Sequence, residues 1–337
     1  MTPLAISIGE AAGIGPDLIL QLYYERKNTN LPVFIVYGNM QFLRSRAKRL
    51  GLPIEIKTST PDKAHEIFAH GLPLVEVADE FVSDSPGMVT KEGSRMALEA
   101  IIHASRDCLA GNCKALVTAP INKAALMEVG FRYPGHTEFL AHLCSGGDGS
   151  PIPIMMLANN NLRVVPLTIH VALNKVPELI NMEMILRKTR IVHEDLQMRF
   201  GISKPKIAIC ALNPHAGEKG TFGHEEIETI SPAIALLKVE GMDVDGPFPA
   251  DTAFYPPNWR QYDVVIAMYH DQALIPIKTI AFEEAVNITL GLPIVRTSPD
   301  HGTAFDIAGK NIAVTKSMLA AIMLAEQMGT ANNRQNR

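Results

Sequence analysis

Residues 184–218, with the sequence MILRKTRIVHEDLQMRFGISKPKIAICALNPHAGE, contain the pattern that decides the fold class. The segment from Met184 to Phe200 is helix-like and stops at Gly201, a residue type favoured just past the end of a helix. An apolar run from Ile207 to Leu212 follows and predicts a buried strand. Polar residues and glycine come directly after that run. A helix, a buried strand and a polar loop in this order predict an α/β fold.

The same alternation extends through the rest of the chain. Two further helices are expected, one from about Thr90 to a stop at Gly111 and one over residues 225–238, before Gly241. Strand-like apolar runs cover residues 4–8, 33–36, 115–117, 154–157, 164–168, 207–212 and 264–268. A chain of 337 residues is too long for one compact unit, and no Gly/Ser-rich linker marks a boundary. We therefore expect two domains between which the chain crosses more than once, with a cleft between them as the natural site.

The composition excludes several classes of protein. With 47% hydrophobic and 20% charged residues the chain is globular rather than disordered, and a net charge of −4 provides no field to attract nucleic acid. The longest apolar stretches, 264–268 and 318–325, fall far short of the roughly 18 residues needed to span a bilayer. Without a basic segment at its start, the chain is expected to be cytoplasmic. The four cysteines form no CxxC pair, so reduced thiols are expected.

Three histidines share one kind of position. His170 closes VVPLTIH, His215 follows IAICALNP and His270 closes VVIAMYH, so each lies just past the carboxyl end of a predicted strand. In open α/β sheets ligands bind at that edge, and three neutral imidazoles can form a metal site with open coordination positions. A histidine alone at such a position is more often a helix cap or a loop donor. Three together favour a metal.

Several polar loops are too rich in glycine and proline for a core. LNPHAGE (212–218) and GPFPADT (246–252), which contains Asp251, have the composition of loops that hold a ligand. SPDHGTAFDIAGK (298–310) suits a planar polar ligand and contains His301, Gly302 and Asp306. GEAAGIGPD (9–17) places Gly13 and Gly15 between a strand and a helix, where they permit close backbone approach. It lacks the GxGxxG dinucleotide pattern, and a tight turn without a ligand explains it equally well.

Candidate anion-binding residues form another group. Lys278 supplies a point charge and Arg296 a planar fork, a pair suited to a phosphate monoester, and Asn287 lies between them in sequence. His136 and Thr137 precede a helix expected over residues 138–144, whose free amide groups can bind an anion. Solvated surface charge is the alternative for the cations, and plain helix capping is the alternative for Thr137.

The motifs as a set resemble the 4-hydroxythreonine-4-phosphate dehydrogenase family of vitamin B6 biosynthesis. The match runs from residue 6 to about residue 328. It is carried by GEAAGIGPD, APINK (119–123), YPGHTEF (133–139), LNPHAGE with GHEE (223–226), GPFPADT, MYHDQ (268–272), AVNITLGLP (285–293) and RTSPDHGTAFDIAG (296–309). The resemblance implies the two-domain fold of isocitrate and isopropylmalate dehydrogenases, with an interdomain cleft and without GxGxxG. It also implies oxidation of a phosphorylated hydroxy amino acid by NAD(P)+ with a divalent metal.

Roles follow from the resemblance residue by residue. Metal ligands are implied at His170, His215 and His270, and substrate contacts at His136, Thr137, Lys278, Asn287 and Arg296. His301, Gly302 and Asp306 lie in a loop similar to the adenosine-side cofactor loop of the wider superfamily, and Gly13 and Gly15 are further cofactor candidates. Lys278 and Asp251 are the candidate general bases, and the sequence does not choose between them. Where the family commonly has Pro and Glu in the opening loop, this chain has Ala11 and Asp17.

The resemblance also implies a domain plan and a homodimer. Residues 1–130 with 275–337 are predicted to form a cofactor-side domain, and residues 131–274 a substrate, metal and dimerisation domain. Family members are homodimers whose sites take metal ligands from both chains. The segment 151–177 carries two strand-like runs joined by Asn159, Asn160 and Asn161, a hairpin that could deliver His170 to a partner.

The expected reaction converts 4-(phosphooxy)-L-threonine to 2-amino-3-oxo-4-(phosphooxy)butanoate, which decarboxylates to 3-amino-2-oxopropyl phosphate. The metal could be zinc, cobalt or magnesium, and imidazole ligands favour the first two. One alternative is a paralogous dehydrogenase acting on 4-phospho-D-threonate or 4-phospho-D-erythronate. Another is a metal-dependent hydrolase or a binding protein, which the DHGTAFDIAG loop disfavours.

Overall fold

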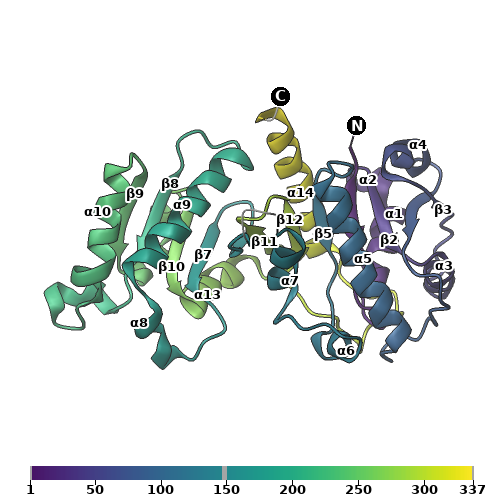
Figure 1. Cartoon of the computed structure of the whole chain (residues 1–337), viewed down its shortest axis with the longest axis horizontal. Helices are drawn as coiled ribbons and strands as arrows, with labels where there is room; N and C mark the ends of the chain where they lie inside the picture. The colour runs from purple at the N-terminus through teal and green to yellow at the C-terminus, as the bar shows by residue number, and fades with distance from the viewer. Residues whose placement is uncertain (1, 146–149, 336–337) are drawn as a thin grey trace. The chain divides into compact units, whose positions relative to one another are not determined.

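The computed structural model describes residues 2–145 and 150–335, which form an α/β protein of two compact units (Figure 1). Unit 1 takes its residues from Met1–Pro153 and Leu292–Arg337, and unit 2 is Ile154–Gly291. The α/β class is the one predicted from the sequence. The predicted boundaries at 130/131 and 274/275 fall inside these units. The second would cut one helix, α13 (His270–Ala281), and the first would separate Phe131 from Leu126, whose carbonyl oxygen accepts the Phe131 N–H at 3.0 Å.

Unit 1 is built on parallel strands in the order β3-β4-β2-β1-β5-β12. Their bounds are β1 (Leu4–Ser7), β2 (Phe34–Gly38), β3 (Ile56–Thr58), β4 (Leu72–Glu76), β5 (Leu116–Thr118) and β12 (Arg296–Pro299). All residues of β1, β2 and β5 are buried, which is what a parallel sheet covered on both faces requires.

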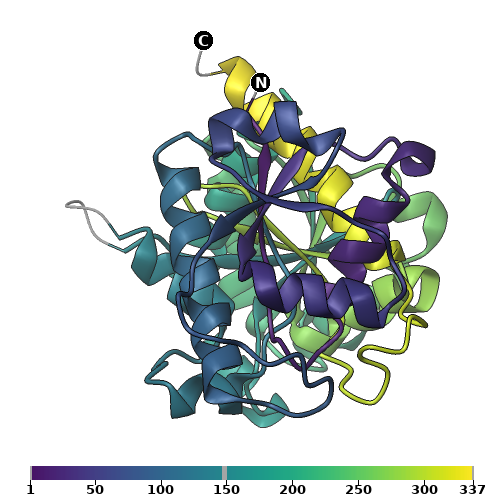
Figure 2. The ribbon, with the colours of Figure 1, turned by 90° about the vertical axis from the view of Figure 1, so that its right-hand side faces the viewer.

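Helices cover both faces of this sheet. Figure 2 shows the strands between α5, drawn in blue, and α14, drawn in yellow, and both helices contact β1 and β5. The helix α5 begins after the N-cap Thr90, whose Oγ1 accepts a hydrogen bond from Gly93 N. Its buried residues include one stripe of Ala97, Ile101, Ala104 and Cys108. The helices are α1 (Gly15–Tyr24), α2 (Arg26–Thr29), α3 (Met40–Arg49), α4 (Ala64–Phe68), α5 (Lys91–Leu109), α6 (Lys123–Glu128), α7 (His136–Leu143) and α14 (Lys316–Gln335), with a 3-10 turn at Pro61–Lys63.

Unit 2 has a mixed sheet in the order β11-β6-β7-β10-β8-β9. Its strands are β6 (Ile154–Ala158), β7 (Arg163–Thr168), β8 (Lys206–Cys210), β9 (Asp243–Phe248), β10 (Val264–Tyr269) and β11 (Val286–Leu290). The strands β6 and β7 form the predicted hairpin, in which Asn159 Oδ1 accepts hydrogen bonds from the N–H groups of Asn161 and Leu162. From β7 onward the strands are parallel, so β7, β10 and β8 end at the same edge.

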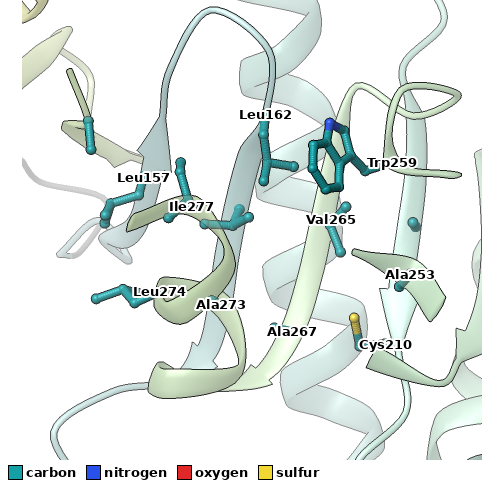
Figure 3. Close-up of a cluster of buried hydrophobic side chains, with 13 residues drawn as sticks. Leu157, Leu162, Cys210, Ala253, Trp259, Val265, Ala267, Ala273, Leu274 and Ile277 are labelled. Carbon is teal, nitrogen blue, oxygen red and sulfur yellow. The ribbon is translucent and has the colours of Figure 1, made fainter. Parts of the chain in front are cut away.

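The helices of unit 2 pack against its sheet around an apolar core. They are α8 (Val176–Leu179), α9 (Met182–Met198), α10 (Ser231–Val239), α11 (Ala250–Ala253), α12 (Pro256–Trp259) and α13. Tight 3-10 turns lie at Leu173–Lys175 and Pro214–Gly220, and a wide π-helical turn lies at Glu226–Ile230. One apolar cluster joins Trp259, Leu162 and Val265 with the α13 residues Leu274 and Ile277 (Figure 3). This cluster fixes α13, and therefore His270 at its first turn, against the strands. Within the described residues, no helix is long and apolar enough to cross a membrane.

Candidate active site

The three predicted metal ligands follow three neighbouring parallel strands. His170 comes two residues after β7, His270 directly after β10, and His215 five residues after β8. Because β10 pairs with both β7 and β8, their carboxyl ends meet at one edge of unit 2. The predicted strand-end positions are confirmed.

Two of these histidines lie together. The ring centroids of His170 and His270 are 6.0 Å apart, and both side chains line a pocket of about 280 Å³ with Thr168 and Tyr269. His270 Nδ1 lies 2.7 Å from Asp271 Oδ1, which leaves Nε2 directed away from this carboxylate. A histidine whose second nitrogen is held by a carboxylate has the arrangement common in metal ligands.

His215 is separate from this pair. Among residues 2–145 and 150–335, no group of three or more His, Cys, Asp or Glu side chains is placed to hold a metal. The backbone at His215 is left-handed, with φ 52°, and the four residues after it stay in the same region. Each non-glycine residue there costs about 1–2 kcal/mol, and such strain concentrates at functional sites. His170 is also left-handed, with φ 54°.

The two candidate bases differ in position. Lys278 lies two turns along α13 from His270 and lines a second pocket, of about 430 Å³, together with His270 and Asp271. Its ammonium group lies 5.6 Å from the centroid of the Phe282 ring. Asp251 is exposed on α11, accepts the N–H of Thr252 at 2.8 Å and lines neither of these two pockets as far as the described residues define them. Asn287 is half-buried on β11.

In unit 1 a buried cation stands at the start of β12. Arg296 is 4% exposed, and its Nε and Nη2 donate to Thr118 Oγ1 at 3.1 and 2.7 Å. Burial lowers the pKa of the Arg296 guanidinium to about 10, so the side chain stays charged at neutral pH. A buried guanidinium at a strand end is suited to hold an oxyanion.

The helix α7 begins two residues earlier than the sequence predicts. Gly135 is the N-cap, no side chain caps the helix, and Thr137 lies inside the first turn. The expectation that Thr137 could cap a helix starting at Glu138 is therefore wrong, because the extended Gly135 already ends the loop.

His136 opens this helix beside two cations. Its Nε2 is buried and has no hydrogen-bond partner among the described residues. The pKa of His136 is held well below its usual range, first by burial and then by the positive charges of Arg296 and Lys123. A neutral imidazole, two cations and a helix N-terminus together favour an anion at this place.

The predicted cofactor residues divide into two kinds. Gly13 and Gly15 serve packing, since a Cβ at Gly13 would lie 2.8 Å from Thr303 O and a Cβ at Gly15 would lie 2.7 Å from Ile8 O. Gly302, in contrast, is exposed with open space beside its Cα, and His301 Nε2 is buried without a partner in the described part of the chain. Asp306 is exposed in the same loop.

One of the two residues that depart from the family pattern in the opening loop, Asp17, joins the two cofactor-candidate loops. Asp17 pairs with Arg46 at 2.5 Å and accepts the N–H of Gly309 at 2.7 Å. Arg46 also donates to the carbonyl oxygens of Gly13 and Ala11. The carboxylate at position 17 therefore has a structural partner, and the loops 9–17 and 300–310 pack as one body.

Sequence reasoning missed three residues of these sites. Asp271 directly follows His270, and an acidic neighbour of a candidate metal ligand is a signal that could have identified it. Lys123 closes APINK, a motif whose residues carry no distinctive ligand-binding pattern of their own. Thr118 ends a short apolar strand, and nothing local indicates that its hydroxyl receives Arg296 from a strand 178 residues away in sequence.

Comparisons with known proteins agree on one family. The profile of "Pyridoxal phosphate biosynthetic protein PdxA" matches residues 30–325. The chain is 48% identical to the 4-hydroxythreonine-4-phosphate dehydrogenase of Methylorubrum populi, over 98% of this chain and 96% of the relative. It is similar to the crystal structure of the Klebsiella pneumoniae enzyme of that name (37% identity, TM-score 0.84, 98% and 100% of the two chains). It is also similar to that from Burkholderia phymatum (35%, 0.82, 98% of each).

Proposed function

Since the chain belongs to the PdxA family of pyridoxal phosphate biosynthetic proteins, we propose that it oxidises 4-(phosphooxy)-L-threonine with NAD(P)+ and a divalent metal ion. The chain is an oxidoreductase of this family. The product would be 2-amino-3-oxo-4-(phosphooxy)butanoate, a β-keto acid that loses carbon dioxide to give 3-amino-2-oxopropyl phosphate on the path to pyridoxine 5'-phosphate. The pairing of His170 and His270 beside Lys278 is the observation that carries the proposal.

The histidine pair fits a divalent metal. Two imidazoles 6.0 Å apart between centroids can share one ion, and the carboxylate of Asp271 holds His270 Nδ1 so that Nε2 is available. Zinc or cobalt suits these ligands better than magnesium. The metal would act as a Lewis acid that lowers the pKa of the substrate hydroxyl.

Lys278 is the better candidate for the base. It lines the pocket that also contains His270, whereas Asp251 is exposed on α11. In this role Lys278 accepts the proton of the substrate hydroxyl directly or through a water, while the hydride leaves the carbon that bears this hydroxyl. Asp251 remains a candidate for passing that proton to solvent.

The phosphate group fits the cationic end of unit 1. Arg296 supplies a buried guanidinium, and His136 and Thr137 stand in the first turn of α7. The unpartnered Nε2 of His136 can donate a hydrogen bond from a neutral imidazole. It therefore adds no third positive charge next to Arg296 and Lys123. The resemblance adds Lys278 and Asn287 to the proposed substrate contacts.

NAD(P)+ would accept the hydride at its nicotinamide ring. His301, Gly302 and Asp306 are proposed to contact it, because Gly302 has open space and His301 Nε2 has no partner within the described residues. Gly13 would support this loop through Thr303, and Gly15 would allow the close approach of Ile8 and Ala119, rather than either contacting the cofactor itself.

We further propose a homodimer in which each metal takes histidines from both chains. The pairing of His170 with His270 inside one chain favours His215 as the ligand supplied by the partner. This differs from the expectation that the 151–177 hairpin delivers His170.

A substrate panel on metal-loaded protein tests the proposal. Near-ultraviolet absorbance of reduced nicotinamide should rise with 4-(phosphooxy)-L-threonine and NAD(P)+, and chelation should stop it. Faster turnover of 4-phospho-D-threonate or 4-phospho-D-erythronate would assign the chain to the paralogous activity. Phosphate release without nicotinamide reduction would instead indicate a hydrolase.

A further inference from the structure

A buried carboxylate lies under the segment that leads to His215. Glu226 is 3% exposed and begins the wide turn before α10. Its Oε1 accepts the N–H groups of Leu212 and Asn213, both at 2.8 Å, and its Oε2 accepts Asn213 Nδ2 at 3.0 Å. Three donors to one buried carboxylate stabilise its charge and fix the backbone two residues before His215 begins its turn.

The same carboxylate touches the middle of the turn. Gly217 is buried with φ 73°, and a Cβ there would lie 2.6 Å from Glu226 Oε2. Residues 215–219 are all left-handed, a conformation that four non-glycine residues do not adopt without support. Glu226 therefore contacts both the start and the centre of the segment that holds His215.

The base of the segment is fixed from the other side. Gln272 Nε2 donates to Ala211 O at 2.9 Å, and Gln272 Oε1 accepts the N–H of Met268 at 2.7 Å. This amide links the end of β8 to the end of β10, next to His270. Any change at Glu226 should thus be confined to residues 212–222, beyond the fixed Ala211.

We propose that Glu226 is a positioning residue that sets the His215 turn before any metal binds. The inference rests on the proposed role of His215 as a metal ligand. Because Glu226 already orders the turn, metal binding does not have to order it. The affinity for the metal is therefore higher than it would be if the turn were disordered. Loss of such an outer contact typically lowers metal affinity by about 10- to 100-fold.

The neighbouring Glu225 offers a matched control. It is half-buried, and its Oε2 accepts only the side chain of Asn213, at 2.7 Å, among the contacts of this segment. Glu225→Gln and Glu226→Gln make the same chemical change at adjacent positions. Each variant keeps one acceptor oxygen, but only the second takes the charge from a carboxylate that holds backbone N–H groups of the segment. In either orientation of the new amide, its NH2 group faces a donor, which is Asn213 Nδ2 or the N–H groups of Leu212 and Asn213.

The test uses full-length, metal-free protein with Zn²⁺ alone as the probe. Hydrogen exchange of amides 211–222 is measured first, and Zn²⁺ affinity is then measured by competition with a chromogenic chelator. For Glu226→Gln we expect exchange at least about tenfold faster in 212–222, with Zn²⁺ affinity about 10- to 100-fold weaker. Glu225→Gln should stay within about threefold of the unchanged protein in both measurements.

Two outcomes overturn the inference, and His215→Ala separates them. If His215→Ala weakens Zn²⁺ binding while Glu226→Gln does not, Glu226 is not a positioning residue and the proposed ligand stands. If His215→Ala leaves Zn²⁺ affinity unchanged, the proposed ligand and this inference both fail. Should Glu226→Gln not fold, Gly217→Ala disturbs the same contact from the turn, and it must show the same paired loss.

Discussion

Removal of the Arg296 charge gives a direct test of the proposed phosphate site. Arg296→Met keeps an unbranched apolar stem in the buried space and removes the guanidinium that donates twice to Thr118. A charge-assisted contact to phosphate contributes about 1.5–3 kcal/mol. At about 1.4 kcal/mol per factor of ten, KM for the phosphorylated substrate should rise roughly 10- to 150-fold. KM for NAD(P)+ should stay unchanged.

Two further variants sharpen the interpretation. Thr118→Val leaves the charge and removes the hydroxyl that orients it, so loss of about 0.5–1.5 kcal/mol should raise the substrate KM only about 2- to 12-fold. Arg95→Met is the matched control, since this exposed arginine on α5 pairs with Glu80 and Glu92 at the surface.

Steady-state nicotinamide reduction measures these constants, and urea unfolding shows whether each variant keeps a cooperative fold. An unchanged substrate KM in folded Arg296→Met would refute the phosphate assignment. An equal rise in the KM of NAD(P)+ would move Arg296 to the nucleotide.

Three other predictions follow from the same geometry. Asp271→Asn should weaken metal affinity about 10- to 100-fold in chelator competition, because the carboxylate orients His270 through Nδ1; unchanged affinity would remove it from the site. Since the pKa of His136 is depressed by burial and nearby cations, the unfolded state binds its proton first, and stability should fall as pH drops below about 6.5. His136→Gln should flatten that part of the stability curve, measured by urea unfolding across pH, and an unaltered slope would contradict the burial argument. Mixed inactive chains should regain up to about half of the activity per hybrid when His215→Ala is crossed with His270→Ala, but not when His170→Ala is crossed with His270→Ala; the reverse pattern would return His170 to the partner.

The strands that could be predicted are those in which apolar residues predominate. All seven predicted runs are strands, and β1 and β2 are buried along their whole length. Among the described residues, five strands were not predicted: β3, β4, β9, β11 and β12. Their sequences, such as LPLVE, DVDGPF and RTSP, contain polar residues, glycine or proline that interrupt the pattern. These strands form because they pair with neighbouring strands. That pairing depends on residues far away in the chain, so the sequence of the segment alone does not predict it.

The positions of the histidines were predictable because the end of a strand is visible in the local sequence. The shape of the site was not predictable. A strand followed by a polar loop places a histidine at the sheet edge whatever the rest of the chain does. The left-handed turn at His215 depends on Glu226, a residue beyond the loop itself, and its sequence contains only two glycines, Gly217 and Gly220, to suggest it. The predicted start of α7 was wrong for a local reason: the N-cap is Gly135 and not Thr137, so the helix begins at His136.

Each of the three candidate metal-binding histidines of unit 2, His170, His215 and His270, has a polar anchor near it in the protein. Glu226 holds the segment before His215, and Asp271 holds the ring of His270. Near His170, Lys188 Nζ donates to Leu167 O at 2.5 Å and Thr168 Oγ1 donates to Met268 O at 2.8 Å, which ties the end of β7 to α9 and to β10. Because these contacts form without a metal, the strained backbone is already ordered when the chain folds, and metal binding does not have to order it. Metal binding to such a preset edge loses less conformational entropy, so its affinity should depend on the anchors as much as on the imidazoles themselves.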